Sequence, residues 1–197
     1  WKFYPIRKGP KVFVIGYNKT GTTSVGQAIS RLGYRHTSFN LHIWTLFNDG
    51  RLDEVMEYAR RFDSFDDLPW LTPKLLPRLE REFPGSKYVY LIRDEDSWKS
   101  SFVNWNEYHL GREVDADEGW KFYLKHEGFV QDFFKSQIHS KNSITLSVSD
   151  PVGFEKLGLF LGKSAPQPDF PRDNVTQLNH ERVAKKYTIN LGAENSD

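Results

Sequence analysis

The sequence predicts an α/β fold in which a mainly parallel central sheet is covered by helices on both faces. Two observations carry this prediction. Three short apolar runs with the composition of strands are each followed by a segment with helical character, so the chain repeats the order strand, helix, strand. In the first two runs the apolar residues follow one another without alternation, which is typical of strands buried on both faces.

The three predicted strands are short. The first covers residues 11–16, where an apolar run from Val12 to Ile15 ends at Gly16. The second has its apolar run at residues 88–92, and the third covers residues 143–148. The connections between them are long enough to contain the crossover helices that parallel neighbours require.

The predicted helices follow from apolar spacing, acidic first turns or an initial proline. The first covers residues 22–32, with Val25, Ala28, Ile29 and Leu32 on one face and Gly33 after its end. The others cover residues 51–62, 74–83, 95–105, 118–138 and 151–162, followed by a last helix or an irregular tail near Val183. A polar and aromatic segment at 33–50, which ends in a turn, is assigned neither helix nor strand, and residues 63–73, broken by Pro69 and Pro73, are predicted to form a loop.

Length and composition limit the function. The 197 residues are expected to form a single domain, with a core of about residues 11–174 and an irregular or helical tail at 175–197. A formal net charge of +1 gives no overall field that would favour nucleic acid as a partner. The absence of cysteine excludes disulfides, zinc–thiolate sites and thiol nucleophiles. No apolar stretch approaches the roughly 20 residues of a membrane span.

Cellular location is predicted from weak signals. The lack of cysteine and of an anchor favours the cytoplasm. The chain begins at Trp1 rather than methionine, which indicates a processed or shortened product, so a lost N-terminal anchor stays open as an alternative. Asn18 and Asn174 match the glycosylation pattern, although a glycan at Asn18 would block the loop described next. The oligomeric state is left open.

The loop NKTGTTS, residues 18–24, joins the first predicted strand to the first predicted helix. A helix N-terminus favours an anion, and Lys19 adds a positive charge there. Gly16 and Gly21 have the spacing of a nucleoside-triphosphate loop, but Thr22 stands where that loop has its lysine. The loop is therefore either a phosphate cradle of another kind or an ordinary polar turn.

A second anion-binding pattern follows the second strand. Arg93 stands at the strand end and Ser101 lies eight residues later, in the next predicted helix. An arginine at that edge presents a rigid fork to a phosphate, and the serine adds a hydroxyl donor. The alternatives are a surface ion pair of Arg93 with Asp94 or Glu95 and a serine on a helix surface.

Together these motifs resemble the sulfotransferases that use 3′-phosphoadenosine 5′-phosphosulfate (PAPS). The stretch FVIGYNKTGTTSVGQAI resembles their 5′-phosphosulfate loop, RDEDSWKSS their 3′-phosphate site, and GFEKLGLFLGKSAPQPDFP their closing helix and tail. The resemblance covers roughly residues 11–174 and implies a three-layer P-loop kinase-like fold, PAPS as co-substrate, 3′,5′-adenosine diphosphate (PAP) as product and no required metal. It implies that the co-substrate is bound by Lys19, Thr20, Gly21, Thr22, Thr23, Ser24, Arg93 and Ser101.

The resemblance also implies two catalytic roles. Lys19 would neutralise the leaving phosphate oxygen. Asp67 stands where cytosolic members have the histidine of a His-x-Pro motif, so it is the candidate general base, with Asp66, His36 and His42 as alternatives. The alternative role of Asp67 is that of a turn aspartate before the prolines.

The acceptor is expected to be a small-molecule, lipid or carbohydrate hydroxyl, or an amine. Aromatic residues in the segments that would cover it are Trp44, Phe47, Trp105, Tyr108 and Trp120, each of which is equally consistent with core packing. Two other functions stay open. One is a Mg²⁺-dependent P-loop kinase of nucleotides or small molecules, with Asp94 at the strand end. The other is a nucleotide-binding relative without activity.

Overall fold

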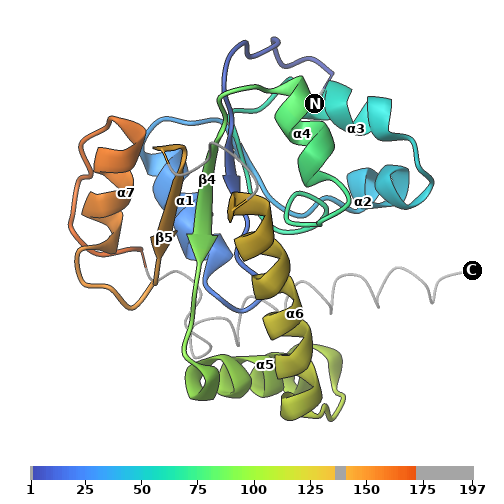
Figure 1. Cartoon of the computed structure of the whole chain (residues 1–197), viewed down its shortest axis with the longest axis vertical. Coiled ribbons are helices and arrows are strands. Elements are labelled where there is room, and N and C mark those ends of the chain that lie inside the picture. Colours follow the sequence, from blue (N-terminus) through green and yellow to red (C-terminus); the bar gives the residue numbers. More distant parts are fainter. Residues whose placement is uncertain (1, 136–140, 172–197) are drawn as a thin grey trace, which may run out of the picture.

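The strands form one parallel sheet. A computed structural model of the chain describes residues 2–135 and 141–171. In these ranges the sheet has five strands in the order β2-β3-β1-β4-β5, and every neighbouring pair is parallel (Figure 1). The strands are β1 Val12–Val14, β2 His36–Thr37, β3 Ser64–Phe65, β4 Lys87–Leu91 and β5 Ser143–Leu146.

Helices cover both faces of this sheet, as predicted (Figure 1). The helices are α1 Thr22–Arg31, α2 Leu41–Asn48, α3 Leu52–Ala59, α4 Leu76–Glu82, α5 Glu95–Leu110, α6 Ala116–Lys135 and α7 Gly153–Leu161. Helices α1 and α7 pack on one face, whereas α2, α3, α4 and α6 pack on the other. None of the helices described here combines the length and the apolar character that crossing a membrane demands.

The alternation of side chains along β1 builds these two layers. Val12 and Val14 point into the core with α1 and α7, while Phe13 and Ile15 point into the core on the opposite face. All four are at most 3% exposed. Successive strand residues point to opposite faces, so a strand that is apolar at every position needs a cover on both. The run of consecutive apolar residues is therefore explained by burial of the strand on both faces, as predicted.

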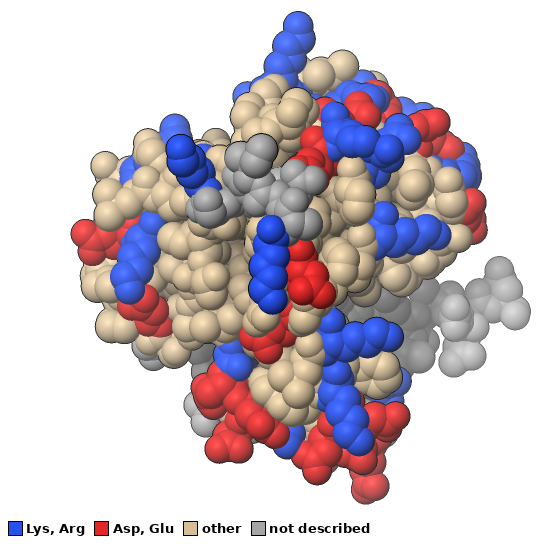
Figure 2. All heavy atoms as spheres, in the orientation of Figure 1, with Lys and Arg blue, Asp and Glu red and all other residues tan. Residues whose placement is uncertain are grey.

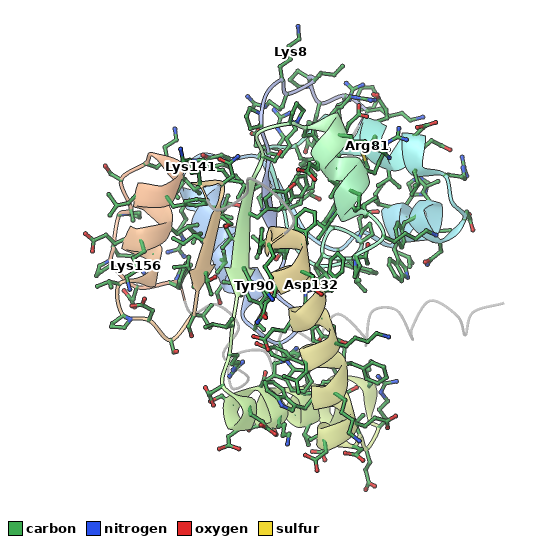
Figure 3. All side chains as sticks on the ribbon, viewed as in Figure 1. Lys8, Arg81, Tyr90, Asp132, Lys141 and Lys156 are labelled. Carbon is green, nitrogen blue, oxygen red and sulfur yellow. The ribbon has the colours of Figure 1, made fainter. Side chains whose placement is uncertain are left out.

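Helix α6 covers β4 and extends beyond the carboxyl edge of the sheet to meet α5 (Figure 1). Tyr90 of β4 and Asp132 of α6 are labelled in Figure 3. Burial raises the pKa of the Tyr90 phenol, and the negative charge of Glu127 on α6 is the next cause of the rise. Lys99 of α5 bonds to Asp117 at the start of α6. Positive and negative side chains are mixed over the visible face in Figure 2.

Helices and strands also occur in the unassigned segment at 33–50 and in the predicted loop at 63–73. The segment at 33–50 holds β2 and α2, and the loop at 63–73 begins with β3. The two strands have two residues each, which is too short to show the alternation of apolar and polar residues that predicts a strand. They become strands because β3 pairs with β1 (Val12 with Ser64) and β2 pairs with β3. Helix α2 begins after Asn40, whose side chain accepts a hydrogen bond from the Ile43 N–H.

The other helices and strands differ from the predicted ones mainly in where they begin and end. Helix α5 continues past its predicted end to Leu110, where Gly111 adopts a φ of 58° and stops it. The last residues of the helix predicted at 118–138, the element near Val183, the tail at 175–197 and the sequon at Asn174 lie outside the described residues.

Candidate active site

The candidate site lies at the carboxyl edge of the three central strands. The loop that begins at Gly16 follows β1, Asp66 and Asp67 follow β3, and Arg93 follows β4. The connection from β1 leads to β2 on one side of the sheet, whereas β4 lies on the other side of β1. Ligands of open α/β sheets bind in the crevice at such a reversal of strand order.

The backbone of the phosphate loop, residues 16–21, has the conformation of an anion cradle. Lys19 and Gly21 both adopt left-handed φ values, 64° and 97°. Gly21 precedes the first residue of α1, and neither a side-chain cap nor an acidic residue occupies the first turn of that helix. Its N-terminal N–H groups and positive dipole end are thus left for an external anion.

Close packing explains the two glycines of the loop. A Cβ on Gly16 would lie 2.5 Å from Leu91 Cβ, and one on Gly21 would lie 2.4 Å from Val148 Cγ1. Thr20 is fully buried and its hydroxyl donates to the Tyr17 carbonyl at 2.6 Å. Of the remaining predicted ligands, Thr22 is buried, Ser24 is half-buried and Thr23 is exposed.

Arg93 and Trp98 hold the strained part of this loop. Arg93 Nη1 donates to the Lys19 carbonyl at 2.9 Å, and Trp98 Nε1 donates to the Asn18 carbonyl at 2.8 Å. A non-glycine residue in the left-handed region costs about 1–2 kcal/mol, which these contacts offset. Sequence analysis missed this role of Trp98, because an indole in an amphipathic helix carries no sign of a distant carbonyl partner.

Arg93 keeps donors for a ligand after this contact. A guanidinium has five N–H donors, and the Lys19 carbonyl accepts one of them. Asp94, suggested above as an ion-pair partner, instead accepts a hydrogen bond from the Ser97 N–H as the N-cap of α5. Ser101 lies half-buried two turns into α5, and its joint role with Arg93 stays a prediction.

Lys19 is a second cation of the site, beside Arg93. Its Nζ lies 4.5 Å from the centre of the Trp105 ring. Burial lowers the pKa of Lys19 to about 8, while the negative charge of Asp67 acts to raise it and the positive charge of Arg93 acts to lower it. Lys19 is therefore near enough to both Asp67 and Arg93 to be influenced by their charges.

Asp67 is the half-buried carboxylate of the site. Its φ is 63°, and its Oδ1 accepts a hydrogen bond from the Leu68 N–H at 2.7 Å. Burial is the main cause that raises the pKa of Asp67; the charge of Asp66 adds to the rise and that of Lys19 opposes it. A raised pKa strengthens a carboxylate as a proton acceptor, which is what a general base requires.

The alternative bases are less accessible or lie farther along the chain. Asp66, next to Asp67, is 1% exposed, with His36 Nε2 at 3.3 Å from its Oδ1, so both side chains of this pair are largely shielded from a ligand. His42 is exposed on α2. The described residues contain no group of three or more His, Asp and Glu side chains arranged to hold a metal ion.

The aromatic residues expected around the acceptor divide into two groups. Phe47 is buried in the core and Trp44 stacks on it, while Trp120 stacks on Tyr123 with ring centres 4.2 Å apart. These three are accounted for by packing. Trp105 is 39% exposed and faces Lys19, and Tyr108 is 42% exposed on the same helix.

A family model described as "Sulfotransferase domain" matches residues 11–112, just over half of the chain. The chain belongs to the sulfotransferase family. The matched segment contains the phosphate loop, Asp67, Arg93 and Ser101, so the resemblance to the family is confirmed, while the roles of these residues and the third motif, at 153–171, stay predictions. No curated protein sequence matches the chain.

Solved structures of sulfotransferases share the fold. The sulfotransferase domain from the curacin biosynthetic pathway aligns with a TM-score of 0.54 at 17% identity, over 80% of this chain and 75% of that one. Mouse sulfotransferase SULT7A1, solved with PAP, aligns with a TM-score of 0.55 at 14% identity, over 98% and 69%. A shikimate kinase from Bacteroides thetaiotaomicron has a TM-score of 0.49 at 15% identity, over 78% and 98%. The two sulfotransferase alignments, together with the parallel sheet covered by helices on both faces, confirm the predicted three-layer α/β fold.

Proposed function

We propose that this sulfotransferase moves the sulfuryl group of PAPS to a hydroxyl or amine acceptor. The observation that carries the proposal is that Arg93 donates to the Lys19 carbonyl in the loop before the open N-terminus of α1, and that Asp67 is near enough for its charge to affect the pKa of Lys19. This arrangement offers backbone and side-chain donors to phosphate and a cation for a leaving oxygen. It also offers a carboxylate whose pKa is raised, as a proton acceptor. The mouse relative solved with PAP supports the choice of nucleotide.

The proposed reaction gives each residue a role. Asp67 takes the proton of the acceptor hydroxyl as its oxygen forms a bond to sulfur. The bond between sulfur and the phosphate oxygen breaks, and the electron pair leaves with PAP. Lys19 neutralises the charge that develops on that oxygen. The N–H groups and hydroxyls of residues 20–24 bind the 5′-phosphate, and Arg93 with Ser101 binds the 3′-phosphate.

The kinase alternative is less well supported. It needs Asp94 as a magnesium ligand, but that side chain caps α5. It also needs a lysine directly after Gly21, where this chain has Thr22.

Ligand-dependent stability and product formation together test the function. A ligand at 100 times its Kd stabilises a protein by about 2.7 kcal/mol, so PAP without Mg²⁺ is expected to raise the melting temperature by several degrees. Incubation with PAPS and a panel of phenols, sugars and lipid alcohols, followed by mass spectrometry, is expected to reveal a sulfated product. Stabilisation by ATP with Mg²⁺ but not by PAP would favour a kinase, and PAP binding without any product would favour an inactive relative.

Arg93→Ala and Ser101→Ala are expected to reduce discrimination between PAP and adenosine 5′-monophosphate, measured by calorimetric titration. Arg93 supplies charge-assisted hydrogen bonds and Ser101 one neutral bond, so the losses should be about 2–3 and about 1 kcal/mol. Ser100→Ala, on an exposed neighbouring position, is the matched control. Arg93 also holds the Lys19 carbonyl, which is why the ratio of affinities, rather than PAP affinity alone, is measured. Equal affinity of the wild type for both nucleotides would refute the assignment.

A further inference from the structure

A buried polar cluster includes Asp66, the neighbour of Asp67 in the chain. His36 of β2 places Nδ1 2.9 Å from Ser64 Oγ of β3 and Nε2 3.3 Å from Asp66 Oδ1. Asp66 follows β3 and precedes Asp67 in the chain, so one short segment carries both carboxylates. Ser64 is fully buried, and the His36 side chain is 11% exposed.

Burial of the Asp66 carboxylate is energetically unfavourable. It is 1% exposed, and neither oxygen has a hydrogen-bond donor among the described residues. The His36 contact at 3.3 Å is within ion-pair range but misses hydrogen-bond geometry. A buried carboxylate without full compensation costs several kcal/mol, and an apolar residue would pack there more favourably. Packing alone therefore gives no reason for an aspartate at this position.

Helix α1 is built around the same pair. A Cβ on Gly26 would lie 2.4 Å from His36 Nε2 and 3.1 Å from Asp66 Oδ2. Gly26 is in the middle of the helix that begins at the phosphate loop, where glycine costs about 1 kcal/mol relative to alanine. The glycine allows α1 to lie directly against His36 and Asp66. This contact joins the helix that follows the phosphate loop to the segment that carries Asp67.

We propose that His36 and Asp66 are positioning residues for the general base. His36, held by Ser64, fixes the Asp66 carboxylate against α1, and Asp66 in turn places its charge and its backbone beside Asp67. The negative charge of Asp66 opposes ionisation of Asp67 and so makes Asp67 a stronger base. This inference rests on the proposed role of Asp67. The charges that face Asp67 are Asp66 on its own segment and Lys19 on the phosphate loop, with Arg93 of the β4–α5 connection next to Lys19.

The isosteric variant Asp66→Asn tests the electrostatic part. Removal of the neighbouring charge should allow Asp67 to ionise at lower pH. Titration of the Asp67 carboxyl by ¹³C NMR, and the acidic limb of kcat/KM for the acceptor at saturating PAPS, are both expected to move to lower pH. Asp53→Asn, which removes an exposed carboxylate on α3, is the matched control and should move neither. An unchanged Asp67 titration in Asp66→Asn would overturn the proposal.

A double-mutant cycle tests the positioning part. His36→Phe keeps a ring but leaves the Asp66 carboxylate without its partner, and kcat is expected to fall by about 10²-fold, the effect of a misplaced catalytic group. Adding Asp66→Asn should restore part of this loss, because no unpaired charge then remains buried. Gly26→Ala should lower kcat in the same direction by displacing the pair. Independent effects of His36→Phe and Asp66→Asn on kcat would overturn the proposal.

The two proposals fail in different ways. If no acceptor is sulfated but the Asp67 titration still moves in Asp66→Asn, the proposed reaction is wrong and the influence of the pair on Asp67 stands. If product forms but the titration and the cycle show no coupling, the reaction stands and the positioning role is wrong. Should His36→Phe fail to fold, the isosteric Asp66→Asn alone decides through its NMR titration.

Discussion

Lys19→Ala is expected to lower kcat by about 10²–10³-fold while the affinity for PAP changes much less. The ammonium group counters charge that appears only as the bond to sulfur breaks, and loss of one such stabilising group has effects of this size. Lys19 is half-buried at the carboxyl edge of the sheet, where its interaction with an anion is screened less than in water. Single-turnover kinetics with PAPS and calorimetric titration of PAP measure the two quantities.

The pH dependence gives this prediction a second test. Since burial lowers the pKa of Lys19 to about 8, the free enzyme loses this positive charge as the pH rises through that value. The kcat/KM for PAPS should therefore fall on the alkaline side of about pH 8, and Lys19→Ala should lack this limb. Lys74→Ala is the matched control, because Lys74 also lies over an aromatic ring, that of Phe47, on an exposed part of the chain. An unchanged kcat in Lys19→Ala would contradict the assigned role.

Local patterns predicted the parts of the site that lie close together in the sequence. The phosphate loop was recognisable because Gly16, Lys19 and Gly21 stand between an apolar strand and an amphipathic helix, and this order alone puts N–H groups at a helix N-terminus. Arg93 was recognisable because it directly follows an almost wholly apolar run at 88–92. The parallel sheet then brings the two strand ends to the same edge.

The parts that depend on tertiary contacts were missed. Strands β2 and β3 have two residues each and exist only through pairing, so no alternation of apolar and polar residues could predict them. The contact between His36 and Asp66 joins residues 30 positions apart through that pairing, and the role of Gly26 depends on how α1 rests on both. Likewise, the contact of Trp98 with the Asn18 carbonyl spans 80 positions and follows from the position of α5 beside the loop.

Asp67→Asn is expected to lower kcat by about 10²–10⁴-fold with the affinity for PAP nearly intact. Asparagine keeps the size of the side chain and can still accept the Leu68 N–H through its carbonyl oxygen, but it cannot take a proton. An aspartate at its ordinary pKa of about 3.9 is a weak base towards an alcohol. Burial raises the pKa of Asp67 and the charge of Asp66 adds to the rise, so proton transfer from the acceptor becomes less unfavourable.

The pH profile separates this role from a structural one. Asp67 acts as a base only when ionised, so the activity of the wild type should fall as the pH drops through its raised pKa, and Asp67→Asn should lose that acidic limb. Asp66→Asn should instead keep the limb and shift it, since it changes the surroundings of the base and not the base itself. His42→Ala, on the exposed surface of α2, should leave the profile unchanged. Full activity of Asp67→Asn together with loss of turnover in His36→Ala or His42→Ala would move the base to the segment that contains β2 and α2. The sulfuryl transfer itself would survive that result, because the phosphate loop and Arg93 bind the donor independently of which group deprotonates the acceptor.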